Sequence, residues 1–187
     1  AQGIWLGANS SLNARGVFKE QLNPYGLHMG DVLPGGHIDL IANRGYIVSY
    51  AGSLIDVSGT RERVDFREPD QGGNAFVPVS RDIPSFGGQV TLKAGEGMLI
   101  DGTFKADGGT ASGGGTLSAE INKGLRDKPE FPVGGGFFPD DVAALTNRPR
   151  SIVISAASDP VIPGDLPLGG NINTERYNGL AFFNNDQ

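Results

Sequence analysis

The sequence predicts an all-β fold of the solenoid type, in which short strands stack on one another at a regular interval along the chain. Three observations point to it. The 187 residues include 30 glycines and 12 prolines, which suits many tight turns between short strands. No convincing run of apolar residues has the spacing of an amphipathic helix. A motif built on a glycine pair recurs, and its uninterrupted step, from Gly88 to Gly115, is 27 residues long.

The glycine-pair motif consists of two glycines, a polar residue and then alternating apolar positions. Its first two copies continue in step, as "GGHIDLIANRGYIV" and "GGQVTLKAGEGMLI". In a solenoid such copies form equivalent strands that pair in parallel at about 4.8 Å. We therefore expect Ile38 to lie against Val90 and, by the same match, Val48 against Ile100. The four copies are Gly35-Gly36-His37-Ile38, Gly87-Gly88-Gln89-Val90, Gly114-Gly115-Thr116-Leu117 and Gly169-Gly170-Asn171-Ile172.

A second motif ends in glycine and predicts another set of stacked strands. It occurs as "ANSSLNARG", "AGSLIDVSG" and "DGTFKADG". Side chains alternate between the two faces of a strand. One face here changes from neutral Asn13 to negative Asp56 to positive Lys105, whereas a shared catalytic or ion-binding site would need one chemistry. We interpret Asp56 as a residue of the solvated outer face. The other face stays apolar, with Leu12, Ile55 and Phe104.

The spacing of the glycine pairs becomes regular when two loop insertions, residues 60–86 and 122–149, are removed, and a third insertion is expected at about residues 17–34. The sequence is therefore expected to be a single β-solenoid segment, residues 1–187, and part of a longer protein. Each coil of such a segment has the neighbouring coils of the same chain as its main partners.

The insertions are the places where recognition is expected, because loops on a rigid scaffold commonly carry function. Residues 60–86 mix four arginines with five acidic residues, which predicts a solvated and internally compensated flap. Residues 129–139 place Phe131, Phe137 and Phe138 among prolines and glycines. These aromatic residues would either cover the side of the solenoid or form an exposed platform for a sugar or a protein.

Composition excludes several kinds of site. The chain has no cysteine, so it has no disulfide, zinc–thiolate site or cysteine nucleophile. Its net charge of −6 lacks the basic footprint of a nucleic-acid-binding protein. No apolar run approaches the roughly 18 residues of a membrane helix.

Two histidines and three pairs of aspartates are the remaining candidates for chemistry. His37 falls in the variable polar position of the glycine-pair motif, which indicates a surface residue, and His28 lies in the loop "NPYGLHMGD". The sequence "DGTFKADGGTASGGG" has the glycines of a calcium-binding repeat but no regular aspartate series. The sequence therefore assigns no catalytic, cofactor-binding or metal-ligating residue, leaves ligand-binding residues unknown, and predicts no cofactor. The acid pairs that an enzyme of this fold would need are Asp101 with Asp107, Asp140 with Asp141, and Asp159 with Asp165.

Two stretches carry a family resemblance. "DVLPGGHIDLIANRGYIVSYAGSLIDVSGT" and "GGQVTLKAGEGMLIDGTFKADGGTASGGGTLSAEI" resemble the filamentous-haemagglutinin-like exoproteins of bacterial two-partner secretion systems. The likeness covers residues 1–121 well and 150–187 more loosely. It implies a right-handed parallel β-helix, export through an outer-membrane transporter, and a place in a fibrous stalk on the outer surface of a Gram-negative bacterium.

The expected function is thus structural and adhesive rather than enzymatic. The partners would be a glycan or a protein of a host-cell or bacterial surface. Two alternatives stay open at this point. One is a carbohydrate-active β-helix enzyme, a polysaccharide lyase or hydrolase, or its sugar-binding derivative. The other is a solenoid that presents its loops to a partner protein.

Overall fold

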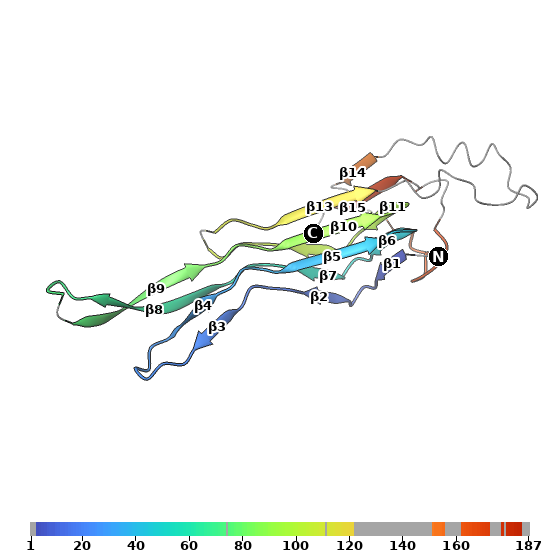
Figure 1. The fold of residues 1–187 in the computed structure, drawn as a ribbon. Helices are drawn as coiled ribbons and strands as arrows, with labels where there is room; N and C mark the ends of the chain where they lie inside the picture. The colour runs from blue at the N-terminus through green and yellow to red at the C-terminus, as the bar shows by residue number, and fades with distance from the viewer. Residues whose placement is uncertain are drawn as a thin grey trace, which may run out of the picture.

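The chain folds into β-strands that form three parallel sheets and two antiparallel hairpins (Figure 1). The computed structural model describes residues 3–73, 75–110, 112–121, 151–155, 162–172, 177 and 179–184. Among these residues no helix is long and apolar enough to cross a membrane. The strands are β1 (Gly3–Leu6), β2 (Ser11–Asn13), β3 (Phe18–Gln21), β4 (Met29–Val32), β5 (His37–Ala42), β6 (Tyr46–Ser49), β7 (Leu54–Asp56), β8 (Arg61–Pro69), β9 (Phe76–Pro84), β10 (Gln89–Ala94), β11 (Gly97–Ile100), β12 (Thr103–Lys105), β13 (Thr116–Ile121), β14 (Ser151–Ser155) and β15 (Leu180–Asn184).

The parallel strands form three sheets, which we number 1 to 3. Sheet 1 has the order β1-β6-β11-β15-β14, sheet 2 the order β2-β7-β12, and sheet 3 the order β5-β10-β13. The chain visits these sheets in a fixed order, since β5, β6 and β7 lie in sheets 3, 1 and 2, and so do β10, β11 and β12. The predicted all-β class with parallel strand pairing is confirmed.

The two contacts that test the predicted stacking most directly are both present. Ile38 of β5 is the register partner of Val90 of β10, and Ile55 of β7 is the partner of Phe104 of β12. The third copies follow the same register, because Leu117 pairs with Val90 and Leu12 with Ile55. The motifs thus mark equivalent strands in sheets 2 and 3.

In sheet 1 the predicted register is wrong by one residue. Val48 pairs with Leu99, and Ile100 pairs with Ser49 rather than with Val48. The reason lies in the turn before each strand. Residues 43–45 separate β5 from β6, whereas only residues 95–96 separate β10 from β11. Because side chains alternate along a strand, a shift of one residue exchanges the two faces.

The core lies where the inward faces of the three sheets meet. Side chains from every sheet contribute to one apolar cluster, and each of the following is at most 1% exposed: Ile47, Met98 and Ile100 from sheet 1, Ile55 from sheet 2, and Val90, Leu92 and Ala94 from sheet 3. This shared burial is what holds the sheets together, at about 25 cal/mol for each Å² of apolar surface removed from water.

The glycine pairs are required by the close approach of successive strands. A Cβ atom added to Gly88 would lie 2.0 Å from the carbonyl oxygen of Gly36, and one added to Gly115 would lie 2.0 Å from that of Gly88. The turn glycines have a different role, since Gly45 and Gly52 have φ angles of 84° and 83°, which favour glycine.

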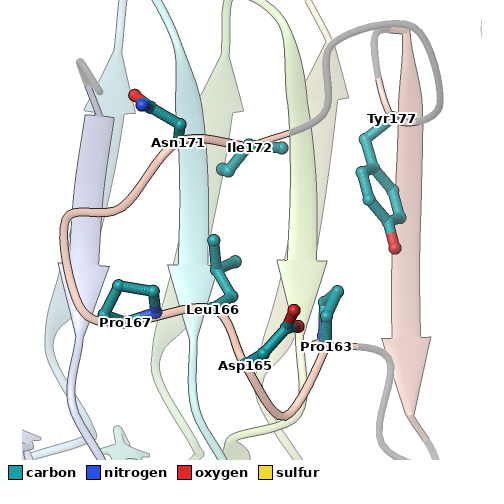
Figure 2. A pocket seen from close by; sticks show the side chains of 7 residues that line it. All are labelled: Pro163, Asp165, Leu166, Pro167, Asn171, Ile172 and Tyr177. Carbon is teal, nitrogen blue, oxygen red and sulfur yellow. The ribbon is translucent and has the colours of Figure 1, made fainter.

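The fourth glycine pair, Gly169-Gly170, does not extend sheet 3, so this part of the predicted repeat is wrong. Residues 162–172, which we call the strap, contain no strand and cross the outer face of sheet 1 (Figure 2). Prolines at 160, 163 and 167 lack the backbone N–H that a strand ladder needs. The strap buries Ile162 and Ile172 against the outer face of sheet 1, in a second apolar cluster with Tyr46, Val48, Leu99 and Tyr177.

Candidate functional site

The first two predicted insertions are β-hairpins rather than irregular loops. β3 pairs with β4, and β8 pairs with β9, both antiparallel. Each hairpin follows a strand of sheet 2 and precedes a strand of sheet 3, so the two leave the molecule at the same corner and project on the same side (Figure 1). We call residues 17–34 and 60–86 together the hairpin pair. The third predicted insertion, residues 122–149, lies outside the described residues.

His28 joins the two hairpins. Its backbone N–H donates to Oδ2 of Asp65 at 2.9 Å, and its carbonyl accepts from the Asp65 N–H at 2.7 Å. The imidazole ring packs on Phe18, with ring centroids 4.5 Å apart. Its Nε2 lies 3.4 Å from Oε1 of Glu62, and its Nδ1 lies 3.7 Å from Oε1 of Glu20. These contacts give His28 a structural role at the joint, which the loop sequence did not indicate.

Asp65 is fixed from both hairpins. It accepts a hydrogen bond from Ser80 Oγ at 2.5 Å in addition to the one from His28 N–H. These hydrogen bonds, that of Ser80 first, hold the pKa of the Asp65 carboxyl below its usual value. The carboxylate is thus a charged acceptor at neutral pH, and the hairpins are held in one relative position.

Exposed aromatic side chains and arginines cover the outer half of the hairpin pair. Tyr25 and Phe76 are each 63% exposed, and Phe66 is 36% exposed. Arg67 lies between the two hairpins, with its Cζ 4.5 Å from the ring centroid of Tyr25 and 5.1 Å from that of Phe76. Such cation–π contacts hold flexible side chains in place while leaving ring faces open to solvent. The arrangement is suited to contact with another molecule.

The charges of the hairpin pair largely compensate one another, as the sequence predicts. Arg61 pairs with Asp82 at 2.5 Å, and Arg81 pairs with Glu68 while its Cζ lies 5.8 Å from the ring centroid of Phe66. These side chains are half exposed, so each ion pair contributes little to stability. Their effect is to leave the surface without a strong charge of either sign.

Asp56 lies on the predicted outer face, between the exposed Asn13 and Lys105, but it does not face water as expected, since it is only 7% exposed. Its Oδ1 accepts from the Ser58 N–H at 2.9 Å, and its Oδ2 lies 3.6 Å from Nε of Arg15. Burial raises the pKa of this carboxyl, but hydrogen bonds from Ser58 and the charges of Arg15 and Lys105 outweigh it, so the pKa lies below its usual value. The burial comes from stacking, because Asn13 and Lys105 pair with Asp56 on its two sides.

The other predicted candidates are scattered. His37 is exposed on β5, as expected of a surface position. Asp101 is 2% exposed and accepts the Ile162 N–H at 2.8 Å, whereas Asp107 is exposed after β12. Within the part of the chain that the structure describes, no group of three or more histidines or acids could hold a metal ion. Phe131, Phe137, Phe138, Asp140, Asp141 and Asp159 lie outside the described residues.

A pocket of about 330 Å³ lies between the strap and Tyr177 (Figure 2). Its lining combines apolar side chains with one carboxylate, that of Asp165, and one amide, that of Asn171. Asp165 is exposed, so this pocket presents its charge to solvent. The remaining lining residues are Pro163, Leu166, Pro167, Ile172 and Tyr177.

Sequence reasoning missed the aromatic surface of the hairpin pair, although a signal was present. The stretches "RERVDFRE" and "FVPVSRDI" alternate charged or polar residues with apolar ones, which is typical of strands rather than of a flap. The exposed rings of Phe66 and Phe76 follow from that hairpin geometry. Comparison of the chain with family models, with curated proteins and with solved structures finds no match.

Proposed function

We propose that the chain is an adhesive stalk segment of a secreted, filamentous-haemagglutinin-like exoprotein, and that it is not an enzyme. Its architecture would be a right-handed parallel β-helix, each coil of which passes through sheets 3, 1 and 2. The fixed order in which the chain visits these sheets supports this architecture, as does the parallel register of His37–Ala42, Gln89–Ala94 and Thr116–Ile121. The hairpin pair would be the adhesive surface.

One observation carries the assignment of adhesion to the hairpin pair. Eleven large apolar side chains are exposed in the described part of the chain, and eight of them belong to the hairpin pair. Large apolar groups that are exposed on neighbouring elements are typical of a site of interaction. The four from residues 17–34 are Val17, Leu22, Tyr25 and Leu33, and the four from residues 60–86 are Phe66, Phe76, Val77 and Phe86.

The partner would be a glycan or a protein on a cell surface. Aromatic rings such as Tyr25 and Phe76 offer flat apolar faces on which a sugar ring or an apolar side chain can pack. The compensated charges of the hairpin pair and the net charge of −6 do not favour a nucleic acid. Export through an outer-membrane transporter would suit a chain without cysteine, because no disulfide can form before the pore is crossed.

Binding of the protein to bacterial and host cells, and to a glycan array, tests this proposal. The informative variant carries Tyr25→Ser and Phe76→Ser, both at 63% exposure. The matched control carries Ile41→Ser and Leu168→Ser, which are 51% and 62% exposed and lie outside the hairpin pair. We expect a loss of binding of about tenfold or more in the first variant and none in the second, because aromatic residues dominate the energy of most interfaces.

Two outcomes would count against the proposal. Equal binding by the two double variants would remove the hairpin pair as the adhesive surface. Release of unsaturated or shortened sugars from polysaccharides, with or without calcium, would show an enzyme. Circular dichroism of both variants establishes beforehand that the fold is intact, which is expected because the replaced side chains are exposed.

A further inference from the structure

The strap makes hydrogen bonds to the residues that directly follow two strands of sheet 1. Its first residue, Ile162, donates its N–H to Oδ2 of Asp101 at 2.8 Å, directly after β11. The Leu166 carbonyl accepts from the Tyr50 hydroxyl at 2.8 Å, directly after β6. Asp101 also accepts from Nδ2 of Asn184, the last residue of β15, at 3.4 Å. The ends of two neighbouring strands are therefore tied directly to the strap, and β15 is tied to one of these ends through Asp101.

The strap also buries apolar surface over several strands at once. Ile162 and Ile172 are 5% and 8% exposed, and they pack in one cluster with Tyr46, Val48 and Leu99, each at most 2% exposed. This cluster extends to both sides of β6 and β11, since Trp5 of β1 and Phe182 of β15 are partly buried in it. The apolar cluster on the outer face of sheet 1 thus includes side chains from its first strand to its fourth.

Strands that only pair with their neighbours in a stack can unfold independently of more distant strands. In sheet 1, β1 pairs with β6, and β6 pairs with β11, but β1 does not pair with β11. In such arrays stability is a sum of nearest-neighbour terms, so the terminal strands can open separately from the rest. A segment that is hydrogen-bonded at the ends of β6 and β11, and that shares an apolar cluster with residues of β1 and β15, would remove that independence.

We infer that the strap is a clamp that makes the stacked strands unfold as one unit. Its hydrogen bonds to Asp101 and Tyr50 fasten it over the paired strands β6 and β11, and the apolar cluster it shares with them includes residues of β1 and β15, which do not pair with each other. The inference goes beyond the proposed function, because it depends on the contacts of the strap and sheet 1 and not on adhesion. Failure of the hairpin pair to bind a cell would leave it untouched.

Two probes at opposite ends of sheet 2 test the clamp. Ser11 on β2 and Lys105 on β12 are both exposed and lie in the two outer strands of that sheet, with β7 between them. Since the chain has no cysteine, Ser11→Cys or Lys105→Cys introduces a single labelling site for a fluorescent dye. Urea unfolding is then followed at each dye and at Trp5, the only tryptophan.

With the strap intact, the transitions at the two dyes are expected to coincide. In proteins that also carry Tyr50→Phe and Asp101→Asn, the two midpoints should separate by about 0.5 M urea or more. Tyr50→Phe alone, a milder change, should give a smaller separation and keeps the test valid if the double variant does not fold. Asp165→Asn, an exposed change on the strap, is the control and should leave the transitions together.

Separate transitions with the strap intact would overturn the inference. So would coincident transitions in both the double and the single strap variant, even at a lower shared midpoint. That second result would mean that the strap adds stability without coupling the strands.

Discussion

Leu99→Ala tests whether the outer face of sheet 1 is a second core. Leu99 lies in β11, between its register partners Val48 on β6 and Phe182 on β15. The face of a sheet that points away from the shared core would ordinarily be solvated. Leu99 is instead 0% exposed, because the strap and Tyr177 cover this face.

The size of the expected effect follows from this burial. Truncation of a fully buried leucine to alanine costs about 2–5 kcal/mol, since apolar contacts are lost and a cavity remains. Leu117 supplies a matched comparison, because it is also a leucine in a parallel strand but is 47% exposed. The same truncation at Leu117 should cost about 1 kcal/mol.

Urea unfolding followed by circular dichroism measures the difference. If the free energy of unfolding falls by about 2 kcal/mol per molar urea, Leu99→Ala should lower the unfolding midpoint by about 1 M more than Leu117→Ala does. Equal shifts for the two variants would refute the reasoning, because they would mean that Leu99 is no better covered than Leu117. If the free energy of unfolding of Leu99→Ala were no longer linear in urea concentration, its unfolding would no longer be all-or-none.

Three further predictions concern close packing and pH. Gly88→Ala should lower stability by about 3 kcal/mol or more in thermal unfolding, because its Cβ would lie 2.0 Å from the Gly36 oxygen, whereas Gly164→Ala, with open space around it, should change stability by less than about 0.5 kcal/mol. The pKa of Asp56 is lower in the folded chain than in the unfolded chain. The ionised carboxylate therefore stabilises the fold above the unfolded pKa of about 4, and this contribution is lost as the pH falls through the folded pKa. Asp56→Asn should accordingly make the free energy of unfolding depend less on pH on the acid side. Burial raises the pKa of the Tyr50 hydroxyl. The neutral hydroxyl therefore stabilises the fold below the unfolded pKa of about 10, and this contribution is lost as the pH rises through the folded pKa. Above about pH 10 the urea midpoint should fall less in Tyr50→Phe than in the native chain.

Strand pairing in sheets 2 and 3 could be predicted from the sequence because glycine marks each copy. A side chain cannot fit where Gly35, Gly88 and Gly115 approach the next strand, so these residues keep the register visible in the sequence. The alternation that follows them then assigns the inward face. The register pair of Ile38 and Val90, which are 52 residues apart in the sequence, was predicted from this pattern alone.

Sheet 1 could not be predicted in the same way. The turn at Gly95–Glu96 is one residue shorter than the turn at Asn43–Gly45, which shifts β11 against β6 without changing the appearance of either strand. The signal that was available is the continuous apolar run in "GYIVSY" and "GMLI", which is typical of a strand buried on both faces. What covers the second face, the strap, is far away in the sequence.

The candidate site depended on contacts that no local pattern contains. Tyr25 and Arg67 belong to different hairpins, which His28 and Asp65 join, and they meet across this joint. The burial of Asp56 is of the same kind, since it comes from strands before and after its own. The charge balance of residues 60–86 could be predicted, because it depends only on composition and on ion pairs within one hairpin.

The base of the second hairpin has a consequence for engineering. Thr60 and Ser85 close it with two short hydrogen bonds, from the Ser85 N–H to the Thr60 carbonyl and from the Thr60 N–H to Ser85 Oγ, both at 2.8 Å. Gly109 donates to the Ser85 carbonyl at 2.8 Å and holds this closure from the next corner. A foreign peptide grafted in place of residues 62–83 would therefore begin and end at a hydrogen-bonded hairpin base whose two strands are held side by side. These hydrogen bonds thus mark the limits of the segment that an engineer would exchange.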